Sequence, residues 1–177
     1  MHARGDSGRT RPSPMTASYG SWPRPAAAMA LAVDTAVSAA RAGDAAAFAE
    51  AADDLGRVEP EQLAVLLGTV TRDLLERSHP DGLDSDDVEH VLRSSLKLGA
   101  GWYESLDGDA LVLALTGALG VSTDPDPDEP PRPGGAAVVA HGLLLIAEQL
   151  RVLAQPAAPF LNAALSELMR AQTVELP

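Results

Sequence analysis

The chain contains no cysteine. Disulfide bonds, thiolate metal sites and a cysteine nucleophile are therefore excluded. Lys97 is the only lysine, and aromatic residues make up 3% of the chain. The sequence also lacks a lysine-bearing phosphate loop, a G-x-S-x-G motif and an H-E-x-x-H motif. These absences favour a protein without a catalytic centre or cofactor, although a triad assembled from distant residues would leave no such local motif.

Long apolar runs are missing too, because no segment approaches the roughly 20 apolar residues of a membrane span. The net charge is −12, and residues 1–28 contribute +3, which leaves −15 on the rest of the chain. Such an acidic body repels phosphate backbones and anionic membrane surfaces. We therefore expect neither nucleic acid nor a membrane as a partner, and we expect a cytoplasmic protein.

Hydrophobic residues make up 46% of the chain, which is enough to build a core. From Ala26 onward these residues recur with a helical period, and no segment alternates with a period of two. We therefore expect an all-α fold, an irregular bundle of about six or seven helices in one domain over residues 26–176. Residues 1–25 lack an apolar period and are expected to form a disordered tail. The Pro- and Asp-rich segment 122–135 is expected to be a flexible acidic loop.

Capping residues indicate where the helices begin and end. Asp44, Asp84 and Asp107 are suitable N-caps, and glycines such as Gly43 and Gly120 are suitable stops. The expected helices cover about 26–42, 45–56, 60–78, 85–99, 108–119, 136–154 and 159–174.

The helix expected at 136–154 is apolar on two sides. One stripe consists of Val139, Leu143, Ile146, Leu150 and Leu153. The other side carries Val138, His141, Leu145 and Val152. A helix with two apolar faces is either sandwiched inside a bundle or shared with another chain. The second alternative makes these four residues a contact surface for a partner protein or for a second copy of the chain.

Two residue pairs have the spacing of metal ligands. Glu76 and His79 form an E-x-x-H pattern, and Asp87 and His90 repeat it with aspartate. This spacing resembles that of ferritin-like di-iron bundles, and the resemblance implies a metal-dependent enzyme. At about 100° per residue, however, both pairs point away from the apolar stripes of their helices, whereas di-iron ligands point inward. Solvated polar faces are therefore the preferred interpretation, and no metal is expected.

Trp102 and Tyr103 follow one another in a glycine-marked connector. Aromatic residues on loops are frequent at binding surfaces, but in a chain so poor in aromatics they can equally close the end of a bundle. His141 allows a similar pair of interpretations, either a ligand-contacting histidine or a buried, hydrogen-bonded one.

The leading hypothesis for function is a non-catalytic interaction or regulatory domain that binds a protein partner or itself as a homodimer. The alternative is a small-molecule-binding domain with an apolar pocket between helices 108–119 and 136–154. An apolar cavity of a few hundred Å³ or more would favour this alternative. A metal-dependent enzyme that uses Glu76, His79, Asp87 and His90 is the third hypothesis.

Overall fold

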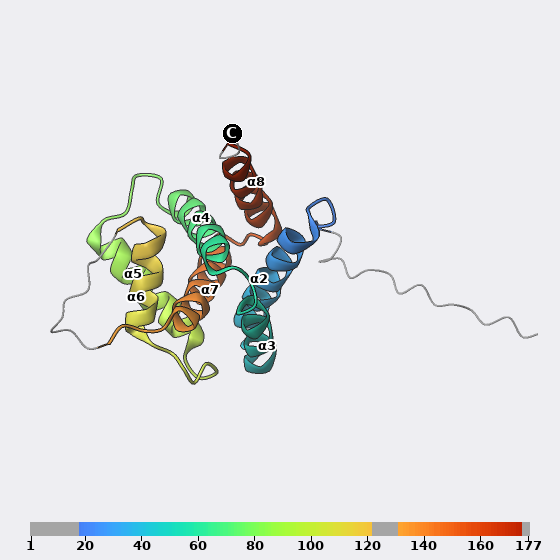
Figure 1. Ribbon diagram of the computed structural model, residues 1–177. Helices are drawn as coiled ribbons and strands as arrows, with labels where there is room; N and C mark the ends of the chain where they lie inside the picture. The colour runs from blue at the N-terminus through green and yellow to red at the C-terminus, as the bar shows by residue number, and fades with distance from the viewer. Residues whose placement is uncertain (1–17, 122–130, 175–177) are drawn as a thin grey trace, which may run out of the picture.

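The computed structural model describes residues 18–121 and 131–174, and it is all-helical in these ranges. Seven helices follow one another (Figure 1): α2 (Arg24–Ala42), α3 (Ala45–Leu55), α4 (Pro60–Ser78), α5 (Ser85–Gly99), α6 (Gly108–Ala118), α7 (Gly135–Val152) and α8 (Ala158–Val174). The predicted all-α fold is confirmed, and every predicted helix is found within about two residues of its expected bounds. Most of the predicted loop at 122–135 and most of the predicted tail lie outside the described residues.

The predicted caps account for the helix boundaries. The Asp44 carboxylate accepts the backbone N–H of Ala47 at the start of α3. Asp84 and Asp87 form a reciprocal capping box at the start of α5. Both arrangements satisfy backbone donors that the first helical turn leaves without partners. At the end of α2, Gly43 takes a φ of +69°, a left-handed conformation that a side chain would strain.

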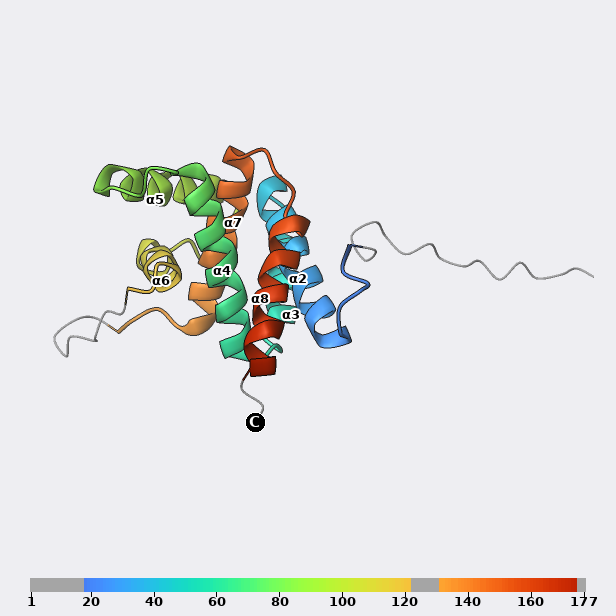
Figure 2. The same cartoon turned by 90° about the horizontal axis from the view of Figure 1, so that it is seen from above.

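Helix α7 lies at the centre of the molecule and packs against α2, α4, α5 and α6. Figure 2 shows α5 and α6 on one side of it and α2, α3 and α8 on the other. Every residue from Ala140 to Leu150 is buried. Of the two alternatives for this helix, the structure supports the one that places it inside the bundle.

By length and composition alone, α7 could span a membrane, with a mean hydropathy of 1.3 over its 18 residues. Its length of 18 residues is just below the roughly 20 apolar residues on which the expectation of no membrane span was based. However, 61% of this helix is buried among its neighbours. The central place of α7 in the bundle accounts for its apolar composition. The apolar composition is therefore weak evidence for a membrane span.

The segment that precedes α2 is packed rather than loose. Tyr19 is 1% exposed, and its hydroxyl donates a hydrogen bond to the Asp34 carboxylate at 2.8 Å. The Trp22 indole donates to the Asn162 side chain of α8 at 2.5 Å. The prediction of a disordered tail up to residue 25 is therefore wrong for residues 18–25. Two aromatic side chains tie this segment to α2 and α8.

Candidate functional site

The four residues of the predicted contact surface on α7 do not form one exposed face. His141 and Leu145 are fully buried. Leu145 packs in a core cluster with Leu75, Val91, Leu111 and Leu115. Only Val152, which is 53% exposed, faces the solvent strongly, and Val138 is partly buried. The contact surface proposed from the sequence is therefore corrected, because its central residues lie inside the bundle.

His141 joins α7 to the start of α6. Its Nε2 atom accepts the backbone N–H of Asp107 at 2.8 Å, so the proton of the neutral ring sits on Nδ1. Nδ1 then donates to the carbonyl of Ala137 at 2.7 Å. Both ring nitrogens are thus used within the fold, and the interpretation of His141 as a buried, hydrogen-bonded residue is the one that the geometry supports.

Trp102 and Tyr103 form an aromatic cluster with Phe48 of α3. The Phe48 ring meets the rings of Trp102 and Tyr103 edge-on, with centroids 5.3 Å away in both cases. The indole of Trp102 donates to the Leu98 carbonyl at 2.6 Å. Tyr103 also lies 5.5 Å from the His141 ring, and burial raises the pKa of its hydroxyl. The cluster connects α3 with the centre of the bundle, and Tyr103 lines the groove described below.

The two residue pairs with the spacing of metal ligands are not brought together as one site. His79 caps the end of α4, and its Nε2 lies 3.9 Å from a carboxylate oxygen of Asp87. Glu76 and His90 are exposed. Within residues 18–121 and 131–174, no group of three or more His, Asp or Glu side chains could hold a metal ion. The inward-pointing ligand sets of di-iron bundles therefore have no counterpart in this part of the chain.

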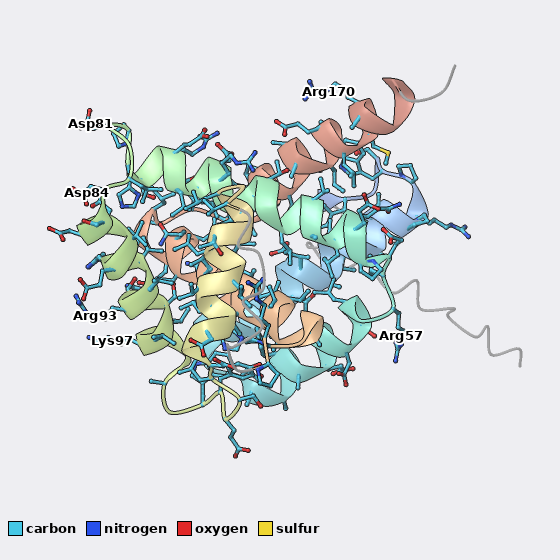
Figure 3. The ribbon with its side chains drawn as sticks, turned by 60° about the vertical axis from the view of Figure 1, so that its left-hand side comes forward. Arg57, Asp81, Asp84, Arg93, Lys97 and Arg170 are labelled. Atoms are coloured by element: carbon cyan, nitrogen blue, oxygen red, sulfur yellow. The ribbon has the colours of Figure 1, made fainter. Side chains whose placement is uncertain are left out.

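Many charged side chains lie on the outside of the bundle, whereas Glu148 is buried and pairs with Arg151. Arg93 and Lys97 project from α5 away from the other helices in Figure 3. Arg93 is paired with Glu89 on the same helix. Such exposed pairs on one helix contribute little to stability and serve mainly solubility. The surface pairs of α5 therefore do not form a binding cavity. The two grooves described below both lie at α3.

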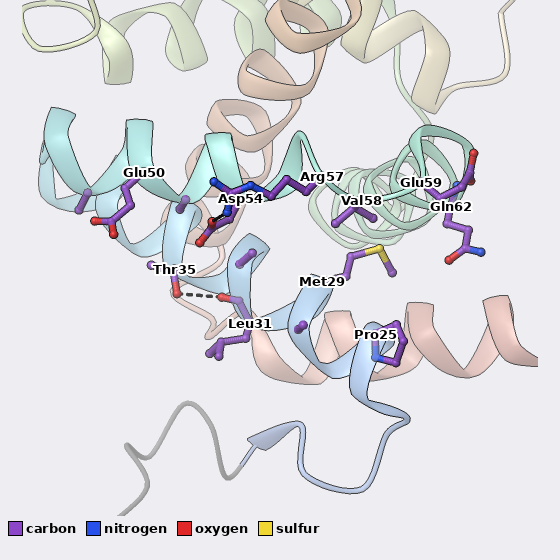
Figure 4. A pocket seen from close by; sticks show the side chains of 14 residues that line it. Pro25, Met29, Leu31, Thr35, Glu50, Asp54, Arg57, Val58, Glu59 and Gln62 are labelled. Atoms are coloured by element: carbon purple, nitrogen blue, oxygen red, sulfur yellow. Dashed lines mark hydrogen bonds and ion pairs between the residues drawn. The ribbon is translucent and has the colours of Figure 1, made fainter.

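Helix α3 is bordered by a groove on each side. The α2–α3 groove has a volume of about 770 Å³, and its walls come from α2, α3 and the connection to α4 (Figure 4). Several of its polar groups bind one another or the backbone. Asp54 pairs with Arg57 at 2.7 Å, the Glu59 carboxylate accepts the N–H of Gln62, and the Thr35 hydroxyl donates to a carbonyl of its own helix.

The α3–α7 groove lies on the other side, between α3, the start of α4 and the start of α7, and has a volume of about 830 Å³. Its walls are mostly small or apolar side chains. They include Phe48, Ala49, Ala52, Leu55, Val58, Leu63, Ala64, Tyr103, Ala136, Ala137, Val138 and Val139. Ser105 and Asp53 are the polar side chains in the described lining besides the Tyr103 hydroxyl. The groove thus combines a large apolar surface with very few polar groups, as sites for small molecules do.

The alternative hypothesis placed a pocket between helices 108–119 and 136–154, whereas the two grooves described above lie at α3. These helices, α6 and α7, pack directly on one another. Gly142 of α7 lies so close to α6 that a methyl group on it would meet the Ala114 side chain at 3.9 Å. Small residues let α6 and α7 approach closely at this contact. At the α3–α7 groove small residues leave open space instead, because α3 packs mainly on α2.

Most residues of this groove, including Phe48, Ala52 and Leu63, were not predicted from the sequence. A signal was present in the runs of alanine at 45–52 and 136–140, since short side chains on facing helices leave space between them. The chain matches no protein family model, no curated protein and no solved structure.

Proposed function

We propose that this protein binds a small apolar molecule in the α3–α7 groove. The observation that carries the proposal is the groove itself, with its volume of about 830 Å³ and its apolar walls. Binding sites for small molecules have volumes of about 300–1,000 Å³ and are lined mainly by hydrophobic and aromatic side chains. Tyr103 and the alanines of α3 and α7 supply such walls.

The hypothesis of a protein-interaction domain has less support. It started from the second apolar face of α7, and the buried His141 and Leu145 belong to that face. Four large hydrophobic side chains are strongly exposed in the described part of the chain, and they are valines on separate helices and loops: Val65, Val112, Val121 and Val152. The acidic surface is what continues to favour a basic protein partner.

A calorimetric titration with 4-phenylbutanol tests the proposal, because this probe has an uncharged head and an apolar body. At about 0.5 kcal/mol per heavy atom, we expect a Kd on the order of 100 µM. Ala52→Trp places a bulky ring in the α3–α7 groove and should abolish binding. Ala28→Trp is the matched control, since Ala28 is also a helical alanine but lines the α2–α3 groove.

Both substitutions should leave the fold intact, because tryptophan costs only about 0.5 kcal/mol relative to alanine in a helix. Circular dichroism and the melting temperature check this point. No heat of binding by the unmodified protein would contradict the proposal. Equal weakening by Ala52→Trp and Ala28→Trp would show that the probe does not sit in the α3–α7 groove.

A further inference from the structure

Asp53 is the charged residue in the wall of the α3–α7 groove. No residue in the described part of the chain forms an ion pair or hydrogen bond with its carboxylate. The neighbouring Asp54 differs in both respects, since it lines the opposite groove and pairs with Arg57 at 2.7 Å. The α3–α7 groove therefore has a free carboxylate at its edge, and no Arg, Lys or His is among the described residues that line it.

The position of Asp53 within α3 makes the electrostatic potential at this edge of the groove more negative. Asp53 lies in the last turn of α3, and no basic residue accompanies it there. The carboxyl end of a helix carries a partial negative charge of about half an electron. The Asp53 carboxylate and the partial charge of the helix end are both negative and lie beside the groove. Their mutual repulsion makes an acidic residue at this end unfavourable for the helix. A cation bound at this point would relieve the repulsion.

We infer that the ligand of the α3–α7 groove is a hydrophobic monocation, an amine with an aromatic or aliphatic body. This inference rests on the proposed function. The ammonium group lies at Asp53 and the end of α3, and the apolar body lies along the alanines and Phe48. The acidic body of the protein adds a long-range attraction for cations and a repulsion for anions such as fatty acids or nucleotides.

Three probes with the same apolar body separate the effect of charge from that of apolar contact. At pH 7, 4-phenylbutylamine is a cation, 4-phenylbutanol is neutral and 4-phenylbutyrate is an anion. We expect the amine to bind about three- to fivefold more tightly than the alcohol, as for a partly exposed ion pair, and the butyrate to bind more weakly than both. The preference for the amine should shrink at high salt, because ions screen the attraction.

Asp53→Asn and Asp54→Asn form a matched pair of variants. Each removes one negative charge from the last turn of α3, so both should fold and both change the net charge equally. Asp53→Asn should remove the three- to fivefold preference for the amine and leave the affinity for the alcohol unchanged. Asp54→Asn should retain the preference, because Asp54 faces the other groove.

The outcomes distinguish this inference from the proposed function. If the alcohol binds and the amine binds no better, the cation inference is overturned while the apolar site stands. An amine preference that survives Asp53→Asn, or that Asp54→Asn removes equally, also overturns it, because the attraction would then come from the net charge alone. If none of the three probes binds, the proposed function fails as well.

Discussion

Tyr19 holds the segment before α2 against the bundle, and its replacement tests this packing quantitatively. The side chain is 1% exposed, and its hydroxyl donates to Asp34 at 2.8 Å. Truncation of a buried aromatic side chain costs about 3–5 kcal/mol, because apolar contacts are lost and a cavity remains. Tyr19→Ala also removes the hydrogen bond to Asp34, which adds about 1 kcal/mol.

The expected total for Tyr19→Ala is about 4–6 kcal/mol, a large fraction of the 5–15 kcal/mol that stabilises a typical domain. For a chain of this size, each kcal/mol shifts the melting temperature by about 2–4 °C. Differential scanning calorimetry should therefore show a decrease of at least about 8 °C. Tyr19→Phe keeps the ring and loses only the hydroxyl, so its decrease should be about 2–6 °C, or about 1–1.5 kcal/mol.

The two variants together separate packing from hydrogen bonding. If Tyr19→Ala melted within about 1 °C of the unmodified protein, the segment before α2 would be a loose tail, as the sequence analysis expected. Equal decreases for Tyr19→Ala and Tyr19→Phe would show that the hydrogen bond, and not the burial of the ring, stabilises the segment.

Two further predictions concern polar groups inside the fold. His141→Leu leaves the backbone N–H of Asp107 without its acceptor, so we expect a loss of about 1–3 kcal/mol and faster amide exchange at Asp107; unchanged exchange there would refute this role for the histidine. Burial raises the pKa of Asp34 above its ordinary value of 3.8, while the Tyr19 hydrogen bond lowers it, and burial is the larger effect. The folded state therefore binds the proton more tightly, and the stability from this group is present below pH 3.8 and lost as the pH rises through the folded pKa. Asp34→Asn should reduce this loss of stability in urea titrations from about pH 3 to 7, and an unchanged pH dependence would contradict the shift.

The helices could be predicted from the sequence because their signals are local. The side chain of Asp44 caps a backbone group three residues away, and Gly43 ends α2 by its own conformation. The apolar stripes of α4 and α7 likewise repeat within one helix. Such signals do not depend on how the helices are arranged, so the all-α fold followed from them.

The packing of residues 18–25 could not be predicted in this way. Tyr19 and Trp22 are single aromatics without a periodic pattern, and their partners are Asp34 and Asn162, which are 15 and 140 residues away in the sequence. A stretch rich in Ser, Gly and Pro therefore looked like a tail. The burial of this stretch depends on where α8 lies in the bundle. The local sequence pattern carries no information about that position.

The sequence indicated the apolar character of the candidate site but not its location. An apolar pocket between helices was the alternative hypothesis from the sequence, and it was placed between α6 and α7. Alanines at a helix contact allow close packing when the helices approach, as at Ala114, and leave a groove when they do not, as at Ala52. The separation of helices results from the whole bundle, so the alanine pattern could not decide between the two outcomes. Tyr103 and Val138 are the two candidate residues from the sequence that line the groove.

The most direct test of the account is a map of backbone amide shifts in a nuclear magnetic resonance titration with 4-phenylbutanol. We expect the shifted amides to cluster on both sides of the α3–α7 groove, at 48–58 in α3 and its end, at 60–64 in α4, at 103–105 and at 135–140 in α7. Shifts confined to α2 and the α2–α3 groove, shifts around α6, or no saturable shifts at all would contradict the central claim.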